Sequence, residues 1–278
     1  MYFIDTHAHL DMLKKLTPAE AVSASKEERV RYIINVGSSI DGSKKSLEYA
    51  QKFPGVFASI GIHPHYAEGF GNKEMKLLES LISGYNEESD IDPGTDAKRY
   101  DKVVAVGETG FDFYRNISPR PDQERAFRAQ IELAIRYDIP IIIHDRDAHE
   151  DILRVLKGYS GRKGFRGVVH CFSGDTAFAM KCLELGLYIS YTGVITFPNA
   201  ADTLEVVREV PLERIFIETD APFLAPQAKR GKENFPGYVR YIAQKIAEIK
   251  NLPIEEVAKA TSINAQDFFG INTNDYQK

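Results

Sequence analysis

The stretch Phe3-Ile4-Asp5-Thr6-His7-Ala8-His9 opens the chain with a short apolar run that ends in a His-x-His pair. The apolar run predicts a buried strand. Residues two apart in a strand point to the same side, so both imidazoles would project together from the end of this strand. Such a pair can chelate one metal ion, and the positions of the remaining histidines decide whether it does.

Seven later segments share the apolar, β-branched character of the first. They cover residues 32–37, 56–63, 103–108, 140–144, 167–170, 187–193 and 215–220. Near-continuous apolar runs of this kind are typical of parallel strands buried on both faces. Together with residues 2–9, these segments predict eight strands.

Helical patterns separate the predicted strands. The clearest covers 121–137, where Phe127, Ile131 and Ala134 form an apolar stripe opposite charged residues. Further helices are predicted near 43–53, 73–83, 147–158, 175–186, 199–209, 237–250 and 253–269. The alternation predicts an α/β fold, a (β/α)8 TIM barrel that forms a single domain over residues 1–278. A doubly wound open sheet is the alternative.

One interval between strands is longer than most. It contains a polar, acidic segment rich in turn-forming residues, near 84–101. This composition predicts a surface insertion away from any functional site.

Composition limits the class of protein. The chain has 278 residues, 43% of them hydrophobic, and a net charge of −5, so it has no overall attraction for polyanions. A nucleic-acid substrate would therefore need a local basic patch or bound cations.

The chain has no signal-peptide pattern and no apolar run long enough for a membrane span. Two cysteines, Cys171 and Cys182, are too few for a disulfide framework, so we expect a reduced, cytoplasmic protein. We infer no obligate protein partner.

Six of the seven histidines lie at or just beyond the end of a predicted strand, whereas His149 falls in a helical stretch and is expected at the surface. In a barrel, the carboxyl ends of all strands meet at one face, where active sites form. The candidate ligands at these ends are His7, His9, Glu108, His144, His170 and Asp220. Imidazoles with carboxylates suit Zn²⁺, Mn²⁺ or Fe²⁺, and the carboxylates also suit Mg²⁺.

This ligand set predicts a binuclear site. Two cations roughly 3.5–4 Å apart can clamp a phosphoryl group and lower the pKa of a shared water. A mononuclear site of His7, His9 and Asp220 is a leaner alternative. A metal-free polar cluster is disfavoured because it would bury many ionisable groups without partners.

Six motifs in order resemble those of the TatD family of metal-dependent deoxyribonucleases, within the amidohydrolase superfamily. They are Asp5-Thr6-His7-Ala8-His9-Leu10, Gly61-Ile62-His63-Pro64-His65, Gly107-Glu108-Thr109-Gly110-Phe111-Asp112, His144-Asp145-Arg146-Asp147-Ala148, His170-Cys171-Phe172-Ser173-Gly174 and Glu218-Thr219-Asp220-Ala221-Pro222-Phe223-Leu224. The resemblance implies a barrel that hydrolyses phosphodiester bonds in DNA as a 3′-5′ exonuclease, on single strands or 3′ ends, with a role in DNA repair. Asn234-Phe235-Pro236 departs from the family pattern, which has an acidic residue at the middle position.

The resemblance also implies roles for the ligands. His7 and His9 would hold one cation with Asp220, and His144 and His170 would hold the other. Glu108 matches the carboxylate that bridges the two, and the implied metal is Mg²⁺, although the ligand types favour Zn²⁺ or Mn²⁺. Glu108 and Asp220 are the expected catalytic residues. We expect Asp220 to act as the general base, because a carboxylate that touches both metal and water can accept the proton.

Four residues are candidates for substrate binding. His63 is interpreted either as a hydrogen-bond partner of a phosphate or as an outer-shell or structural residue, and His65 as structural. Arg146 could bind a phosphate as a planar fork, or form a salt bridge with Asp112 or Asp145. The loop Lys229-Arg230-Gly231-Lys232 is compact and basic, and predicts contacts from Arg230 and Lys232 to the DNA backbone.

Two other functions remain open from the sequence. The same metal site could serve an amidase, lactonase or deacylase that acts on a small carbonyl compound. A non-catalytic binding protein on a barrel scaffold is disfavoured, because a decayed enzyme would be expected to lose a ligand.

Overall fold

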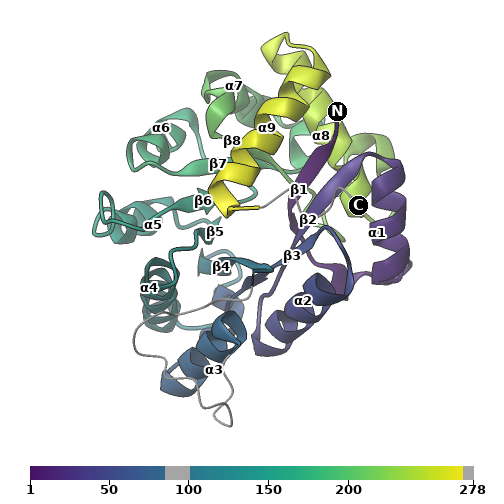
Figure 1. Ribbon diagram of the computed structural model, residues 1–278. Helices are drawn as coiled ribbons and strands as arrows, with labels where there is room; N and C mark the ends of the chain where they lie inside the picture. The colour runs from purple at the N-terminus through teal and green to yellow at the C-terminus, as the bar shows by residue number, and fades with distance from the viewer. Residues whose placement is uncertain (85–100, 272–278) are drawn as a thin grey trace.

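A computed structural model describes residues 1–84 and 101–271 as a ring of parallel strands surrounded by helices (Figure 1). The strands are β1 (Phe3–Ala8), β2 (Val30–Val36), β3 (Val56–Ile60), β4 (Val103–Asp112), β5 (Ile141–Arg146), β6 (Gly167–Val169), β7 (Tyr188–Tyr191) and β8 (Ile215–Ile217). They pair in sequence order from β1 to β8. The bridge between Ala8 and Ala221 then brings the end of β8 back to β1. This order confirms the predicted (β/α)8 barrel, since a doubly wound sheet would reverse its strand order.

Helices follow the strands around the outside of the ring (Figure 1). They are α1 (Pro18–Glu27), α2 (Ile40–Lys52), α3 (Asn72–Ser83), α4 (Arg120–Arg136), α5 (His149–Leu156), α6 (Thr176–Glu184), α7 (Ala201–Glu209), α8 (Val239–Lys250) and α9 (Ile254–Phe269). The predicted helices are all present, and α1 is an addition to them. Thr17 begins α1 with a capping box to Glu20, and Pro18 occupies its first turn.

The strand ends differ from the sequence-based prediction by a few residues, and two of these differences affect the site. β3 ends at Ile60, so His63 lies in the loop beyond it, where it precedes a short 3-10 helix, Pro64–Tyr66. β4 continues past Glu108 to Asp112 and is buried along its whole length. The polar segment predicted near 84–101 lies almost entirely outside the described residues.

The barrel has two hydrophobic cores. The larger one lies between the strands and the surrounding helices. The smaller one combines barrel side chains, such as Ile34, Phe57 and Phe216, with Phe268 and Phe269 from the end of α9. Figure 1 shows α9 lying across one end of the ring of strands. The carboxyl-terminal helix therefore plugs the end of the barrel opposite to the histidine-rich face.

Gly110 permits a close approach between β4 and β5. Its φ is +143°, and a Cβ there would lie 2.1 Å from the backbone oxygen of His144. We expect Gly110→Ala to destabilise the fold by about 2 to 4 kcal/mol, because backbone atoms cannot yield as a flexible side chain would. Urea denaturation measures this change. Gly69→Ala is the matched control, because Gly69 also has a positive φ, +73°, but has nothing within 4 Å of the added Cβ. Equal losses in both variants would contradict the close-approach explanation.

No helix within residues 1–84 and 101–271 is long and apolar enough to cross a membrane.

Candidate metal centre

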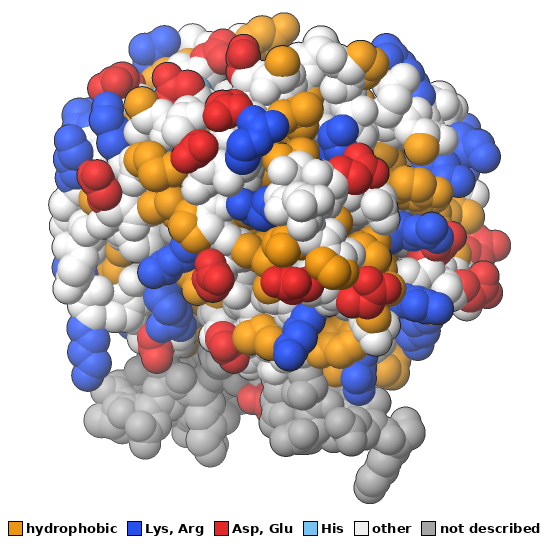
Figure 2. All heavy atoms as spheres, turned by 90° about the horizontal axis from the view of Figure 1, so that it is seen from above, with side chains coloured by type: hydrophobic (Ala, Val, Ile, Leu, Met, Phe, Trp, Pro, Cys, Tyr) orange, Lys and Arg blue, Asp and Glu red, His pale blue; other side chains and the backbone are white. Residues whose placement is uncertain are grey.

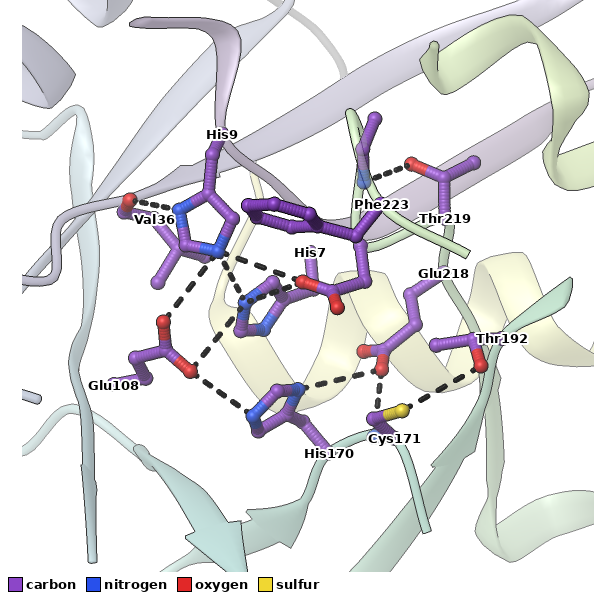
Figure 3. Close-up of polar contacts among 12 residues, drawn as sticks. His7, His9, Val36, Glu108, His170, Cys171, Thr192, Glu218, Thr219 and Phe223 are labelled. Carbon is purple, nitrogen blue, oxygen red and sulfur yellow. Dashed lines mark hydrogen bonds and ion pairs between the residues drawn. The ribbon is translucent and has the colours of Figure 1, made fainter. Parts of the chain in front are cut away.

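The structure brings all six predicted ligands together at the carboxyl end of the barrel. His7 and His9 come from the end of β1, Glu108 from β4, His144 from β5, His170 from just after β6 and Asp220 from just after β8. Figure 3 shows His7, His9, Glu108 and His170 pointing toward one another. A register shift in β1 between Asp5 and Ala8 lets His7 face the site although Ile4 belongs to the barrel interior.

The spacing between imidazole nitrogens fits shared metal ions. His7 Nε2 lies 3.2 Å from His9 Nε2, and His144 Nδ1 lies 3.2 Å from His170 Nε2. Two nitrogens bound to one tetrahedral ion at about 2.05 Å would be about 3.3 Å apart. Each pair therefore has the separation expected of two ligands on one cation.

Glu108 lies between the two imidazole pairs. Its Oε1 is 3.4 Å from His9 Nε2, whereas its Oε2 is 3.0 Å from His170 Nε2 and 3.5 Å from His144 Nδ1. Asp220 Oδ1 adds an oxygen on the first side only, 3.5 Å from His9 Nε2. One carboxylate thus faces both pairs, and the second carboxylate belongs to one of them.

Partners outside the cluster fix the orientation of three imidazoles. His9 Nδ1 is 2.9 Å from the carbonyl oxygen of Val36, which can only accept, so Nδ1 carries a proton and Nε2 is the nitrogen directed to a metal. His144 Nε2 faces Asp112 Oδ2 at 3.3 Å, which leaves Nδ1 for a metal. His170 Nδ1 faces Glu218 Oε1 at 3.5 Å, which leaves Nε2 free in the same way.

Glu218 and Asp112 lie next to candidate ligand imidazoles, and the sequence analysis assigned no role to either at the metal centre. Glu218 is 1% exposed and also accepts from the Cys171 backbone N–H and the Ser190 hydroxyl, so its carboxylate is held in place. The sequence signal for both was that an even number of residues separates each from a predicted ligand, which places the two side chains on the same side of an extended chain. Asp112 is four residues from Glu108 along β4, and Glu218 is two residues from Asp220.

Without a metal, His9 and His170 of the cluster have a raised pKa and so retain a proton more readily than a free histidine. Burial opposes charge on the His9 imidazole, but the carboxylates of Asp220 and Glu108 outweigh it and raise the pKa of His9 to about 9. Burial likewise opposes charge on His170, yet the oxygens of Glu108 and Glu218 raise its pKa well above the usual range. A cation that enters the site must therefore displace protons from these histidines.

His63, Asp112 and His144 form a further group close enough to surround an ion. The nitrogen and oxygen atoms that could bind this ion already take part in hydrogen bonds within the protein. Asp112 Oδ2 accepts from His65 Nε2 at 2.8 Å, and the backbone N–H of His65 donates to His63 Nδ1 at 3.1 Å. Because burial lowers the pKa of His63 well below its usual value, the ring is neutral and carries its single proton on Nε2. This group is a hydrogen-bonded network in which His63 Nε2 is a donor.

A cavity of about 660 Å³ opens over the cluster. Its lining includes the predicted substrate residues His63 and Arg146, but neither Arg230 nor Lys232. No ion pair joins Arg146 to Asp112 or Asp145. Its guanidinium instead lies 4.2 Å from the ring centroid of Tyr114. Arg115, which the sequence analysis did not single out, also lines this cavity.

The loop after β8 is held by packing at the position that departs from the family pattern. Asn234 is buried, and its amide donates to the backbone oxygen of Thr219 at 2.8 Å. The Phe235 ring packs against Tyr238, with 4.4 Å between ring centroids. Phe235 therefore stabilises this loop by aromatic contact.

Comparison with known proteins agrees with this geometry. The profile of the TatD related DNase family matches residues 4–270. The chain belongs to the TatD family.

This TatD-family chain is 38% identical over 269 residues to the uncharacterized metal-dependent hydrolase YabD of Bacillus subtilis, covering 96% of this chain and 99% of YabD. It is 30% identical to the 3′-5′ ssDNA/RNA exonuclease TatD of Klebsiella pneumoniae, covering 92% of each chain. The crystal structure of the TatD homolog YjjV from Escherichia coli superposes with a TM-score of 0.84 at 29% identity, over 97% of this chain and 98% of YjjV. Family membership makes the protein a metal-dependent hydrolase.

The carboxylates behind the histidines provide a test of the metal centre in this TatD-family protein. We expect Glu218→Gln and Asp112→Asn each to weaken metal binding about 10- to 100-fold, because the imidazoles lose the acceptor that orients them. Isothermal titration with Mn²⁺ measures the affinities. Asp151→Asn is the matched control, since Asp151 lies on α5 away from the cavity lining. Unchanged affinity in both test variants would contradict the orienting role.

Proposed function

We propose that this TatD-family hydrolase is a deoxyribonuclease that uses two divalent cations and removes nucleotides from the 3′ end of DNA, preferably single-stranded. The observation that carries the proposal is the position of Glu108, whose carboxylate oxygens lie within 3.8 Å of imidazole nitrogens from both pairs. A carboxylate so placed can bridge two cations. Paired cations suit phosphodiester hydrolysis, which needs charge stabilisation on both attacking and leaving oxygens.

The chain's own residues divide the work at this site. His7, His9 and Asp220 would hold one cation, His144 and His170 the other, and Glu108 both. Bound there, Mg²⁺, Mn²⁺ or Zn²⁺ would supply Lewis-acid stabilisation of phosphoryl oxygens and acidify a water molecule. Asp220 lies beside both His7 and His9 and would orient that water and accept its proton.

Substrate contacts would come from residues around the cavity. His63 presents Nε2–H and would donate to a phosphate oxygen. Arg146 would bind a phosphate with its planar fork. Arg230 and Lys232, which lie outside the cavity lining, would contact the DNA backbone farther from the scissile bond.

Local groups must hold the DNA, because the protein's net charge of −5 does not attract it. Figure 2 shows a side of the barrel rather than its mouth, and on this side acidic, basic and apolar side chains are interspersed without a broad basic region among the described residues. Binding would thus depend on the cavity and its cations.

The direct test is digestion of a 5′-labelled single-stranded oligonucleotide with Mg²⁺ or Mn²⁺. We expect a ladder that shortens from the 3′ end, and no ladder in EDTA or with His144→Ala. An inactive wild type across divalent metals would contradict the proposal. Hydrolysis of small amides or lactones by the same preparation would then favour the carbonyl-directed alternative.

A further inference from the structure

The cavity mouth has two chemically different sides. Strands β4 and β5 stand opposite β8 and β1 in an eight-stranded ring, so the loops after each pair face each other across the mouth. Arg115 and Arg146 lie on the first side. Met12, Phe223 and Leu224 lie on the second.

The first side, which we call the cationic wall and define as Arg115 and Arg146, is free to bind anions. Both residues are exposed, and neither forms an ion pair with a carboxylate of residues 1–84 or 101–271. The Arg146 guanidinium is held 4.2 Å from the ring centroid of Tyr114. A stacked guanidinium without an acidic partner keeps its donors available for phosphate oxygens.

The second side, which we call the apolar wall and define as Met12, Phe223 and Leu224, presents an aromatic ring. Phe223 is 51% exposed, and its ring lies beside His9, with 6.3 Å between ring centroids. Figure 3 shows this ring next to the first imidazole pair. The large exposed hydrophobic residues of the described chain are Met1, Tyr66, Tyr114, Ile117, Phe223 and Ile263. Of these, Tyr66, Ile117 and Phe223 line the cavity, but Ile117 follows β4 and Tyr66 follows β3, so Phe223 is the one that belongs to the apolar wall.

We propose that the two walls bind different parts of a nucleotide strand: Arg115 and Arg146 of the cationic wall each bind a phosphate beside the scissile one, and Phe223 stacks on an adjacent base. The inference rests on the proposed nuclease function and adds the residues that orient its substrate. Bases of a single strand are free to splay onto an exposed ring, whereas those inside a duplex already stack on their neighbours, so the arrangement favours an unpaired end. Stacking is tolerant of base identity, because every base has a π-face.

Binding of an oligonucleotide tests the two walls separately. The probe is a fluorescein-labelled single strand of about 12 nucleotides whose 3′ linkages are phosphorothioates, which keep their charge but resist hydrolysis, in the presence of Mg²⁺. Arg115→Gln and Arg146→Gln should each reduce the slope of log affinity against log salt by about 0.7, the value for one phosphate contact on a single strand. Lys26→Gln is the charge-matched control, since Lys26 is exposed near the end of α1, away from the mouth.

The apolar wall has its own readout. Phe223→Ala should leave the salt slope unchanged and weaken binding roughly 5- to 150-fold, the range for one stacked base. A probe with 2-aminopurine at its 3′ end should lose fluorescence on binding to the wild type but not to Phe223→Ala. Phe223→Leu keeps an apolar side chain without a ring and should also fail to quench. Circular dichroism verifies that each variant is folded.

The outcomes separate this inference from the proposed function. Arginine variants that match Lys26→Gln in slope, or quenching that survives Phe223→Ala, would overturn the division between the walls. Binding that follows both predictions, in a protein that cuts no DNA, would support the walls and contradict the nuclease. A wild type that binds no oligonucleotide would overturn both.

Discussion

Replacing Glu108 with alanine is expected to lower metal-dependent hydrolysis by at least about 10³-fold. Glu108 is buried, and its two oxygens lie within 3.5 Å of imidazole nitrogens from both pairs. Without this carboxylate, four imidazoles would face two dications with only Asp220 to offset the charge. The affinity for cations should therefore fall together with activity. The digestion of end-labelled DNA and the metal content of the purified protein measure the two effects.

The control for this prediction is another glutamate. Glu184→Ala removes an exposed carboxylate at the end of α6, far from the cavity lining, and should change neither metal content nor activity. Glu108→Gln retains the shape of the side chain but not its charge, and should resemble Glu108→Ala. Full activity in Glu108→Gln would contradict the bridging role.

Replacing Phe269 with alanine should have the largest effect on stability. Phe269 is 2% exposed and packs against Phe216 and Phe268, with 5.5 Å and 4.9 Å between ring centroids. Removing a buried phenylalanine ring costs about 3 to 5 kcal/mol, because burial is lost and a cavity remains. For a chain of this length, we expect the Tm to fall by roughly 6 to 20 °C.

Urea denaturation followed by circular dichroism measures this loss, and Phe223→Ala is its matched control. Both changes remove the same ring, but Phe223 is 51% exposed, so its loss should change the free energy of unfolding by about 0.5 kcal/mol or less. Similar losses in the two variants would show that α9 does not plug the barrel as described.

The sequence predicted the barrel because eight nearly continuous apolar runs alternate with helical patterns, and most of these runs lead into a histidine or a carboxylate. His144 and His170 could be assigned to one face without coordinates, since parallel strands in a barrel end together. The pairing of the ligands needed the structure. Only distances show that Glu108 faces both pairs whereas Asp220 faces one.

Three features escaped prediction for physical reasons. Helix α1 has a weak apolar stripe, and its signal was the Thr17–Glu20 capping box rather than periodicity. β4 was expected to end at Glu108, so Asp112 was not recognised as a residue of the same strand. The proposed orienting role of Glu218 depends on a contact with His170, 48 positions away in the sequence; the spacing of Glu218 from Asp220 could place it near the site but could not reveal that contact.

Anomalous diffraction from crystals grown with Mn²⁺ tests the binuclear centre most directly. The account predicts two peaks about 3.5 to 4 Å apart with the Glu108 carboxylate between them, one beside His7, His9 and Asp220 and the other beside His144 and His170. A single peak, or peaks that Glu108 does not touch, would contradict it.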